Sequence, residues 1–180
     1  MPRGAPVTFS PGSNERLFNL VVRGLAFSDG HLLVSRWQAG YCFPVGGRLD
    51  HGESLEDAIR REFREETGVS AAVRKLVYFN ENFFVDDRGM SVHELGWFYW
   101  MDLESPVGRP GLSLPHPDSP KLALEYVALD RLEAEGLVPP FLRLYLPRDN
   151  AEGFAHTPRH IFSSDRGDLS PTVREIEWGS

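Results

Sequence analysis

Acidic side chains gather in one short segment of this sequence. Residues 43–69, which read FPVGGRLDHGESLEDAIRREFREETGV, contain five glutamates: Glu53, Glu56, Glu62, Glu65 and Glu66. Like charges four residues apart on a helix repel each other. A stable helix can carry such a group only if the side chains extend into water or if a cation neutralises them.

The spacing of these glutamates separates them into two groups. On a helical wheel, at about 100° per residue, Glu62 and Glu66 lie in line with the apolar stripe, Glu65 lies at its edge beside Arg61, and Glu56 lies on the solvated face. Carboxylates turned toward the protein body are costly without a partner, and one arginine cannot neutralise three of them. Hard oxygen ligands on adjacent helical turns form a site that Mg²⁺ or Mn²⁺ accepts. The spacing therefore favours a metal site over a buried network of ion pairs.

Local signals define the element that carries these side chains. Ser54 and Asp57 match a capping box at the start of a helix, and Gly68 suits the left-handed position after its last turn. Residues 38–53 hold four glycines and one proline, which is typical of a turning loop. The segment therefore predicts a loop followed by a helix over 54–67.

The rest of the chain predicts one α/β domain. Asp29-Gly30 between two apolar, β-rich runs is a strong hairpin signal. Residues 92–103 are bulky on both strand faces, which predicts a strand in the middle of a covered sheet. Residues 103–120 contain five prolines and predict a long surface loop. The other expected elements are strands over 71–79 and 121–129, short helical pieces over 130–136 and 140–146, and edge strands over 159–162 and 173–178.

Composition limits the classes of function. The 180 residues carry a net charge of −7 with a pI near 5.4, which argues against broad binding to nucleic acid or to anionic membranes. No run approaches the ~20 apolar residues of a membrane span, and the N-terminus lacks the apolar core of a signal peptide. The single cysteine, Cys42, cannot form an internal disulfide, which suits a reducing compartment. We therefore expect a cytoplasmic protein that binds neither nucleic acid nor membrane.

The glutamate-rich segment resembles the Nudix box of the Nudix hydrolase (MutT-like) family. That pattern is Gly-x5-Glu-x7-Arg-Glu-U-x-Glu-Glu-x-Gly-U, where U is aliphatic, and the chain matches it from Gly47 through Glu53 and Arg61 to Val69. Phe63 at an aliphatic position is the one departure, and it keeps the bulk and the hydrophobicity.

The resemblance implies a fold and a division of the chain. The fold is an α/β/α sandwich on a mixed β-sheet, with the box folded as loop–helix–loop. The Nudix domain is expected over 19–148, after an irregular N-terminal arm over 1–18. Residues 149–180 are expected to form an extension that adds edge strands to the same domain.

The resemblance also implies a chemistry. Nudix hydrolases use Mg²⁺ (or Mn²⁺) to cleave the pyrophosphate bond of a nucleoside diphosphate linked to a moiety X, giving a nucleotide and X-phosphate. The implied metal ligands are Glu62, Glu65, Glu66 and the carbonyl of Gly46. Arg61 is implied to orient Glu62. The implied structural positions of the box are Gly47, Glu53 and Gly68.

The general base and the substrate contacts stay open. Family members place the base in the box or on a later loop, and the candidates are Glu65, Glu81 and Glu94. We expect Glu94 to be an added ligand or base; the alternative is a plain hydrogen-bonded strand glutamate. Arg36 and Arg48 are candidate phosphate contacts. Subfamily signals for X are missing, so the expected partner is a small-molecule nucleotide of unspecified kind.

Two alternatives on the same fold stay open. One is a regulatory module that binds a nucleotide without hydrolysing it, although such family members usually have an eroded box. The other is an isomerase, which would need a catalytic cysteine facing the metal, and Cys42 is its candidate. Dimers are common in the family, so the resemblance also leaves a homodimer open.

Overall fold

Two β-sheets form the frame of the molecule in the computed structural model, in which residues 7–8, 16–86, 88–165 and 172–177 are described. The main sheet has the strand order β1 (Val7–Thr8), β2 (Arg16–Leu25), β7 (Ser91–Leu103), β6 (Ala71–Val85), β10 (Arg159–Asp165) and β11 (Thr172–Glu175). The smaller sheet has the order β3 (Phe27–Ser28), β4 (His31–Trp37), β9 (Leu122–Ala128) and β8 (Leu114–Pro115), and β5 (Cys42–Pro44) pairs with β4. In the main sheet β2 runs parallel to β7 and β10 runs parallel to β6, whereas β6 and β7 are antiparallel.

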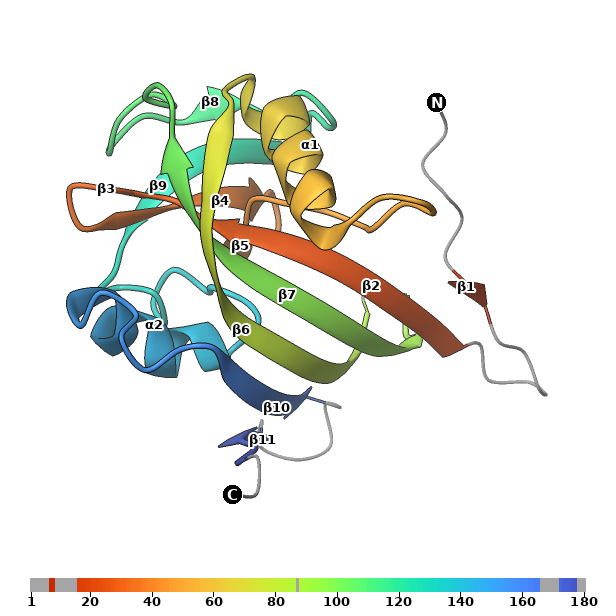
Figure 1. Cartoon of the computed structure of the whole chain (residues 1–180). Coiled ribbons are helices and arrows are strands. Elements are labelled where there is room, and N and C mark those ends of the chain that lie inside the picture. Colours follow the sequence, from red (N-terminus) through yellow and green to blue (C-terminus); the bar gives the residue numbers. More distant parts are fainter. Residues whose placement is uncertain (1–6, 9–15, 87, 166–171, 178–180) are drawn as a thin grey trace.

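A helix covers each face of the main sheet. Figure 1 shows α1 (Leu55–Thr67) on one side of the sheet and α2 (Phe141–Ala151) on the other. Adjacent residues of a strand point to opposite faces. In β7, Tyr99 accordingly packs in the core cluster that includes α1, and Phe98 packs in the cluster that includes α2. This arrangement confirms the expected α/β/α sandwich on a mixed sheet.

Several local predictions are confirmed. The N-terminus of α1 is capped by Ser54, whose side chain accepts a hydrogen bond from the Asp57 backbone N–H at 3.1 Å, and Gly68 follows the helix with φ 71°. Asp29 and Gly30 both have positive φ, at 48° and 75°, as a two-residue hairpin turn requires. The strand expected in the middle of the sheet is β7, which lies between β2 and β6.

Two predictions about the second half of the chain are wrong. Residues 130–136 form turns rather than a helical piece, because Gly136, at φ 67°, ends the segment before a stable helix can nucleate. The segment 159–162 belongs to β10, which is not an edge strand, because β10 pairs with both β6 and β11. Ile161 of β10 also packs in the core on the α2 side, so the strand is buried as well as paired on both edges.

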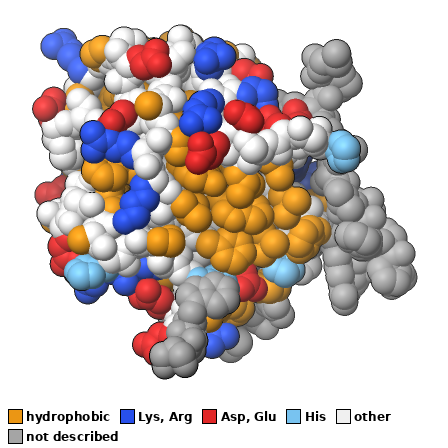
Figure 2. Space-filling model, in the orientation of Figure 1, with side chains coloured by type: hydrophobic (Ala, Val, Ile, Leu, Met, Phe, Trp, Pro, Cys, Tyr) orange, Lys and Arg blue, Asp and Glu red, His pale blue; other side chains and the backbone are white. Residues whose placement is uncertain are grey.

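Part of the α1 face of the main sheet stays uncovered by the helix. Figure 2 shows hydrophobic side chains gathered over this face. They include half-buried aromatic rings that contact one another: Phe79 with Trp97 at 5.3 Å and Phe83 with Phe162 at 5.5 Å between centroids. Within the described ranges, neither helix is long and apolar enough to cross a bilayer.

Candidate active site

Helix α1 turns two of its glutamates toward the protein interior. Glu62 and Glu66 are 3% and 4% exposed, whereas Glu65 is exposed. The two buried glutamates lie on the same side of α1 as Ile59 and Phe63, which pack in the core. The helical spacing therefore predicted the inward direction of Glu62 and Glu66.

The loop before α1 lies so close to Glu62 that a side chain at position 47 would displace the Glu62 carboxylate. A Cβ atom on Gly47 would lie 2.5 Å from Glu62 Oε2. Gly46 has φ 138°, and a Cβ there would lie 2.2 Å from the Val22 carbonyl oxygen. The Val22 N–H donates to the Gly47 carbonyl at 2.9 Å, so β2 anchors the loop. The two glycines thus let the loop backbone pass between β2 and the Glu62 carboxylate.

Arg61 ties the start of the box to its helix. Its Nε and Nη2 atoms donate to the two oxygens of Glu53, at 3.1 and 2.7 Å. Its Nη1 atom donates to Glu62 at 2.8 Å and to Glu65 at 3.3 Å. The hydrogen bonds from Arg61 lower the pKa of Glu53, and the hydrogen bond to Glu53 raises the pKa of Arg61. Arg61 therefore contacts Glu62 directly, in the geometry that orienting this carboxylate requires.

Glu66 is held by neutral donors from two other elements. Ser35 Oγ of β4 donates to Glu66 Oε2 at 3.1 Å, and His116 Nε2 lies 3.2 Å from the same oxygen. The Asp118 backbone N–H donates to His116 Nδ1 at 3.2 Å. A neutral imidazole with an accepting Nδ1 carries its proton on Nε2, so His116 donates to Glu66.

Sequence reasoning missed His116. It lies in the proline-rich segment after β7, fifty residues beyond Glu66 in the chain. No spacing rule relates these two positions. The five prolines indicated a long surface loop, and they gave no sign that the loop carries a buried histidine back to α1.

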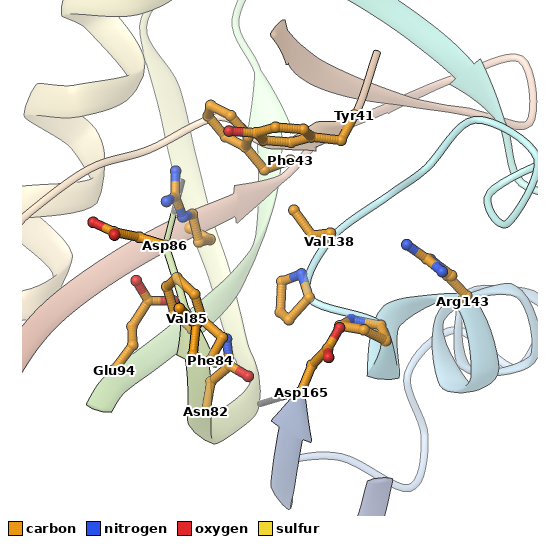
Figure 3. Close-up of a pocket in the computed structure, with 13 residues that line it drawn as sticks. Tyr41, Phe43, Asn82, Phe84, Val85, Asp86, Glu94, Val138, Arg143 and Asp165 are labelled. Carbon is orange, nitrogen blue, oxygen red and sulfur yellow. The ribbon is translucent and has the colours of Figure 1, made fainter. Parts of the chain in front are cut away.

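A cavity of about 540 Å³ lies on the α2 side of the main sheet (Figure 3). Aromatic side chains (Tyr41, Phe43 and Phe84) and charged side chains (Arg23, Glu94 and Arg143) are among its lining. Arg23 joins the cavity to the box, because its Nη1 atom donates to the Gly46 carbonyl at 2.6 Å. Arg23 therefore connects the lining of the cavity to the loop of the box.

Residues 18–148 match the family profile described as the NUDIX domain. The chain belongs to the NUDIX family. Over 55 residues it is 38% identical to the Uncharacterized Nudix hydrolase YvcI of Bacillus subtilis (strain 168), a match that covers 31% of this chain and 33% of that protein. The match to this curated relative thus spans about a third of the relative's length.

Solved structures show the same fold. The mMutator MutT protein from Bacillus halodurans superposes with a TM-score of 0.61 at 16% identity, over 87% of this chain and 97% of that one. A UDP-X diphosphatase superposes with a TM-score of 0.56 at 18% identity, over 87% of this chain and 70% of that one. Both likenesses concern the NUDIX fold alone.

The three glutamates of this NUDIX box point to different neighbours. Arg61 binds Glu62 and Glu65, whereas Ser35 and His116 bind Glu66. Binding of one cation by all three box carboxylates stays a prediction. Among the described residues, the acidic and histidine side chains whose ligand atoms all lie within 4.8 Å of one another are Glu66, His116 and Asp118.

The donor set nevertheless fits a divalent cation. Two carboxylates, Glu62 and Glu66, are buried beside one arginine, and oxygen donors of this kind suit hard cations. Asp118 adds a third carboxylate near Glu66. The His116 Nε2 proton points at Glu66, so His116 acts in this arrangement as a hydrogen-bond donor rather than as a ligand.

The two arginines expected near phosphate differ in position. Arg36 donates to Glu125 and to Glu135, both at 2.7 Å. It therefore ties β4 to β9 and to the turn after it, and this geometry does not support a phosphate contact. Arg48 is exposed; burial raises the pKa of Glu94, and the charge of Arg48 opposes that rise. A phosphate contact of Arg48 stays a prediction.

The two candidate bases outside the box lie on opposite faces of the main sheet. Glu94 lines the cavity and forms hydrogen bonds with Asn19 and Asn82. Burial raises the pKa of Glu94, although the charge of Arg23 opposes this shift. Glu81 faces the other way and accepts a hydrogen bond from His160 Nε2 at 2.7 Å. Of the two, only Glu94 lines the cavity.

Cys42 is buried, and its Sγ lies 3.5 Å from the Glu135 carbonyl oxygen. Burial raises the pKa of the thiol to about 11. The protonated form therefore dominates at neutral pH, which argues against the isomerase alternative.

Proposed function

We propose that this protein is a divalent-metal-dependent pyrophosphohydrolase. Its substrate is a small molecule, a nucleoside diphosphate linked to another moiety, and its products are a nucleotide and a phosphorylated moiety. The observation that carries the proposal is the pair of buried carboxylates, Glu62 and Glu66, beside a single arginine. A cavity large enough for a nucleoside is linked to the loop of the box through Arg23. Membership of the NUDIX family supports the same class of reaction.

The reaction needs a cation because a diphosphate is anionic and repels a nucleophilic oxygen. Bound Mg²⁺ or Mn²⁺ supplies Lewis acidity to a phosphoryl oxygen and lowers the pKa of a water molecule. The residues proposed to hold the cation are Glu62, Glu65, Glu66 and the carbonyl of Gly46. Asp118 is a further carboxylate within reach of Glu66.

The residues of the chain position the reactants. Water adds to one phosphorus atom, the bridging P–O bond breaks, and the departing phosphate keeps the electron pair. Arg61 fixes the direction of Glu62 through the 2.8 Å hydrogen bond. We assign removal of the water proton to Glu65, because it is exposed on the same helix, one turn from Glu62. Glu94 is the alternative base, since it lines the cavity.

The test is a panel of nucleoside diphosphate derivatives incubated with Mg²⁺, with Mn²⁺ or with EDTA. It includes ADP-ribose, sugar nucleotides, diadenosine polyphosphates and 8-oxo-dGTP, and product phosphate is measured after phosphatase treatment. At least one compound should turn over with metal and none with EDTA. The Glu66→Gln variant should lower kcat at least about 100-fold.

Glu56→Gln is the matched control, because it removes the same charge from the solvated side of the same helix. It should keep near-normal kcat. Near-normal turnover by Glu66→Gln would refute the assignment of the site. A chain that binds nucleotides and hydrolyses no member of the panel would instead be a nucleotide-binding regulatory module.

A further inference from the structure

A row of polar side chains crosses four strands on the cavity side of the main sheet. Asn19 of β2 pairs with Glu94 of β7, Glu94 pairs with Asn82 of β6, and Asn82 pairs with Ser163 of β10. Directly paired residues place their side chains on the same face. Beyond this row, the same face carries the apolar core that includes Phe98.

Hydrogen bonds fix the direction of each group in this row. Ser163 Oγ donates to Asn82 Oδ1 at 2.8 Å, which leaves the Asn82 amino group for Glu94. Asn19 and Asn82 both form hydrogen bonds with Glu94. Both hydrogen bonds oppose the rise that burial causes in the pKa of Glu94, as hydrogen bonds donated to a carboxylate do, so both amides donate to it. Glu94 therefore stays an acceptor with lone pairs left for a ligand.

Glu94 presents this acceptor to the cavity. Figure 3 shows its carboxylate, together with Asn82, at the end of the cavity opposite Tyr41 and Phe43. Burial raises the pKa of Glu94, and the charge of Arg23 and the two amides oppose that shift. A ligand that donates hydrogen bonds to the carboxylate would stabilise the ionised form further.

The walls of the cavity suit a planar ring. Tyr41 and Phe43 lie with their ring centroids 6.3 Å apart, and Phe84 also lines the cavity. The Arg23 guanidinium lies 5.0 Å from the Phe43 ring centroid and also contacts the Gly46 carbonyl. Arg23 therefore lies between an aromatic wall of the cavity and the loop of the box.

We propose that the cavity binds the guanine base of the substrate, with Glu94 accepting hydrogen bonds from its N1–H and 2-amino groups. This inference rests on the proposed function and names its substrate class as guanine nucleotides. A carboxylate matches two adjacent N–H donors. Adenine and cytosine place a ring acceptor beside their amino group, and uracil places carbonyls on both sides of its N–H, so each would set an acceptor against Glu94.

The experiment measures binding of GMP, IMP and AMP to the full chain by calorimetry in Mg²⁺ buffer. These monophosphates contain no pyrophosphate bond, so the result does not depend on hydrolysis and separates this inference from the proposed function. GMP should bind at least about tenfold more tightly than IMP, which lacks only the 2-amino group, and than AMP. Equal affinity for the three, or no measurable GMP binding, would overturn the inference.

Two variants sharpen the test. Glu94→Gln keeps the shape of the side chain but presents one donor and one acceptor, so the preference for GMP over IMP should fall to within about twofold. Glu56→Gln is the matched control, because it removes the same charge from the solvated side of α1, away from the residues that line the cavity, and it should keep the preference. A Glu94→Gln variant that retains the native circular dichroism spectrum and the full preference contradicts the proposal.

Discussion

Two clusters of arginine and carboxylate lie on opposite faces of the main sheet. They differ in the number of hydrogen bonds that the arginine donates to the buried carboxylates. On the α2 face, Arg159 donates two hydrogen bonds of 2.8 Å to the buried Asp149, and Tyr78 adds a third at 2.9 Å. On the α1 face, Arg61 directs its paired contact to the half-buried Glu53. The most buried carboxylates on this face, Glu62 and Glu66, receive fewer hydrogen bonds from arginine than Asp149 does.

This difference distinguishes a structural ion-pair network around Asp149 from a candidate cation site around Glu62 and Glu66. Asp149 is neutralised in place, and although burial raises its pKa, the hydrogen bonds from Arg159 and Tyr78 hold the pKa below its usual value. Glu62 receives one N–H group of Arg61. Glu66 receives hydrogen bonds from two neutral side chains. Negative charge in excess of arginine is what a cation site needs.

The first prediction separates the two clusters by their effects on activity and stability. Asp149→Asn should lower the free energy of unfolding by about 3 kcal/mol, because it breaks a buried ion pair, and should leave kcat within about twofold. Glu66→Gln should leave the melting temperature unchanged or higher, because it removes one of two neighbouring like charges, and should lower kcat at least about 100-fold.

Thermal unfolding followed by circular dichroism, together with initial rates, measures both quantities on the same preparations. The comparison fails if Glu66→Gln melts well below the native chain, or if Asp149→Asn loses turnover while its melting temperature is unchanged. Either result would mean that the charge balance of a cluster does not distinguish its role.

The second prediction concerns the neutral donors around Glu66. His116→Ala should lower kcat about tenfold and weaken Mn²⁺ binding, because Glu66 loses the hydrogen bond that fixes its direction. His116→Gln should recover part of both, since an amide can also donate. Mn²⁺ titration followed by electron paramagnetic resonance provides a readout that a purely structural histidine would leave unchanged.

The smallest expected effect is at Cys42. Cys42→Ala should keep full hydrolase activity. In the native chain, iodoacetamide should label the thiol slowly, and the rate should rise about tenfold per pH unit up to the pKa of about 11, because only the thiolate reacts. The unfolded chain serves as the control and should label fast near pH 9. Loss of activity in Cys42→Ala would reopen the isomerase alternative.

Much of the box could be predicted from local pattern. The 3.6-residue repeat placed Glu62 and Glu66 on the core side of α1, where they are buried, and Glu65 at the edge of that side. The helix boundaries followed from Ser54 and Gly68, whose roles depend only on their immediate neighbours. The contacts of Glu66 could not be predicted in this way, because the groups that bind it come from β4 and from the segment after β7.

The amino-acid sequence alone determined the family, the box helix and the inward direction of its carboxylates, because each depends on residues within a few helical turns. Only the tertiary structure decided that His116 reaches Glu66. It also decided that Asn19, Glu94 and Asn82 form one row. These contacts join segments far apart in the chain, and strand register, which brings them together, depends on the packing of the whole sheet.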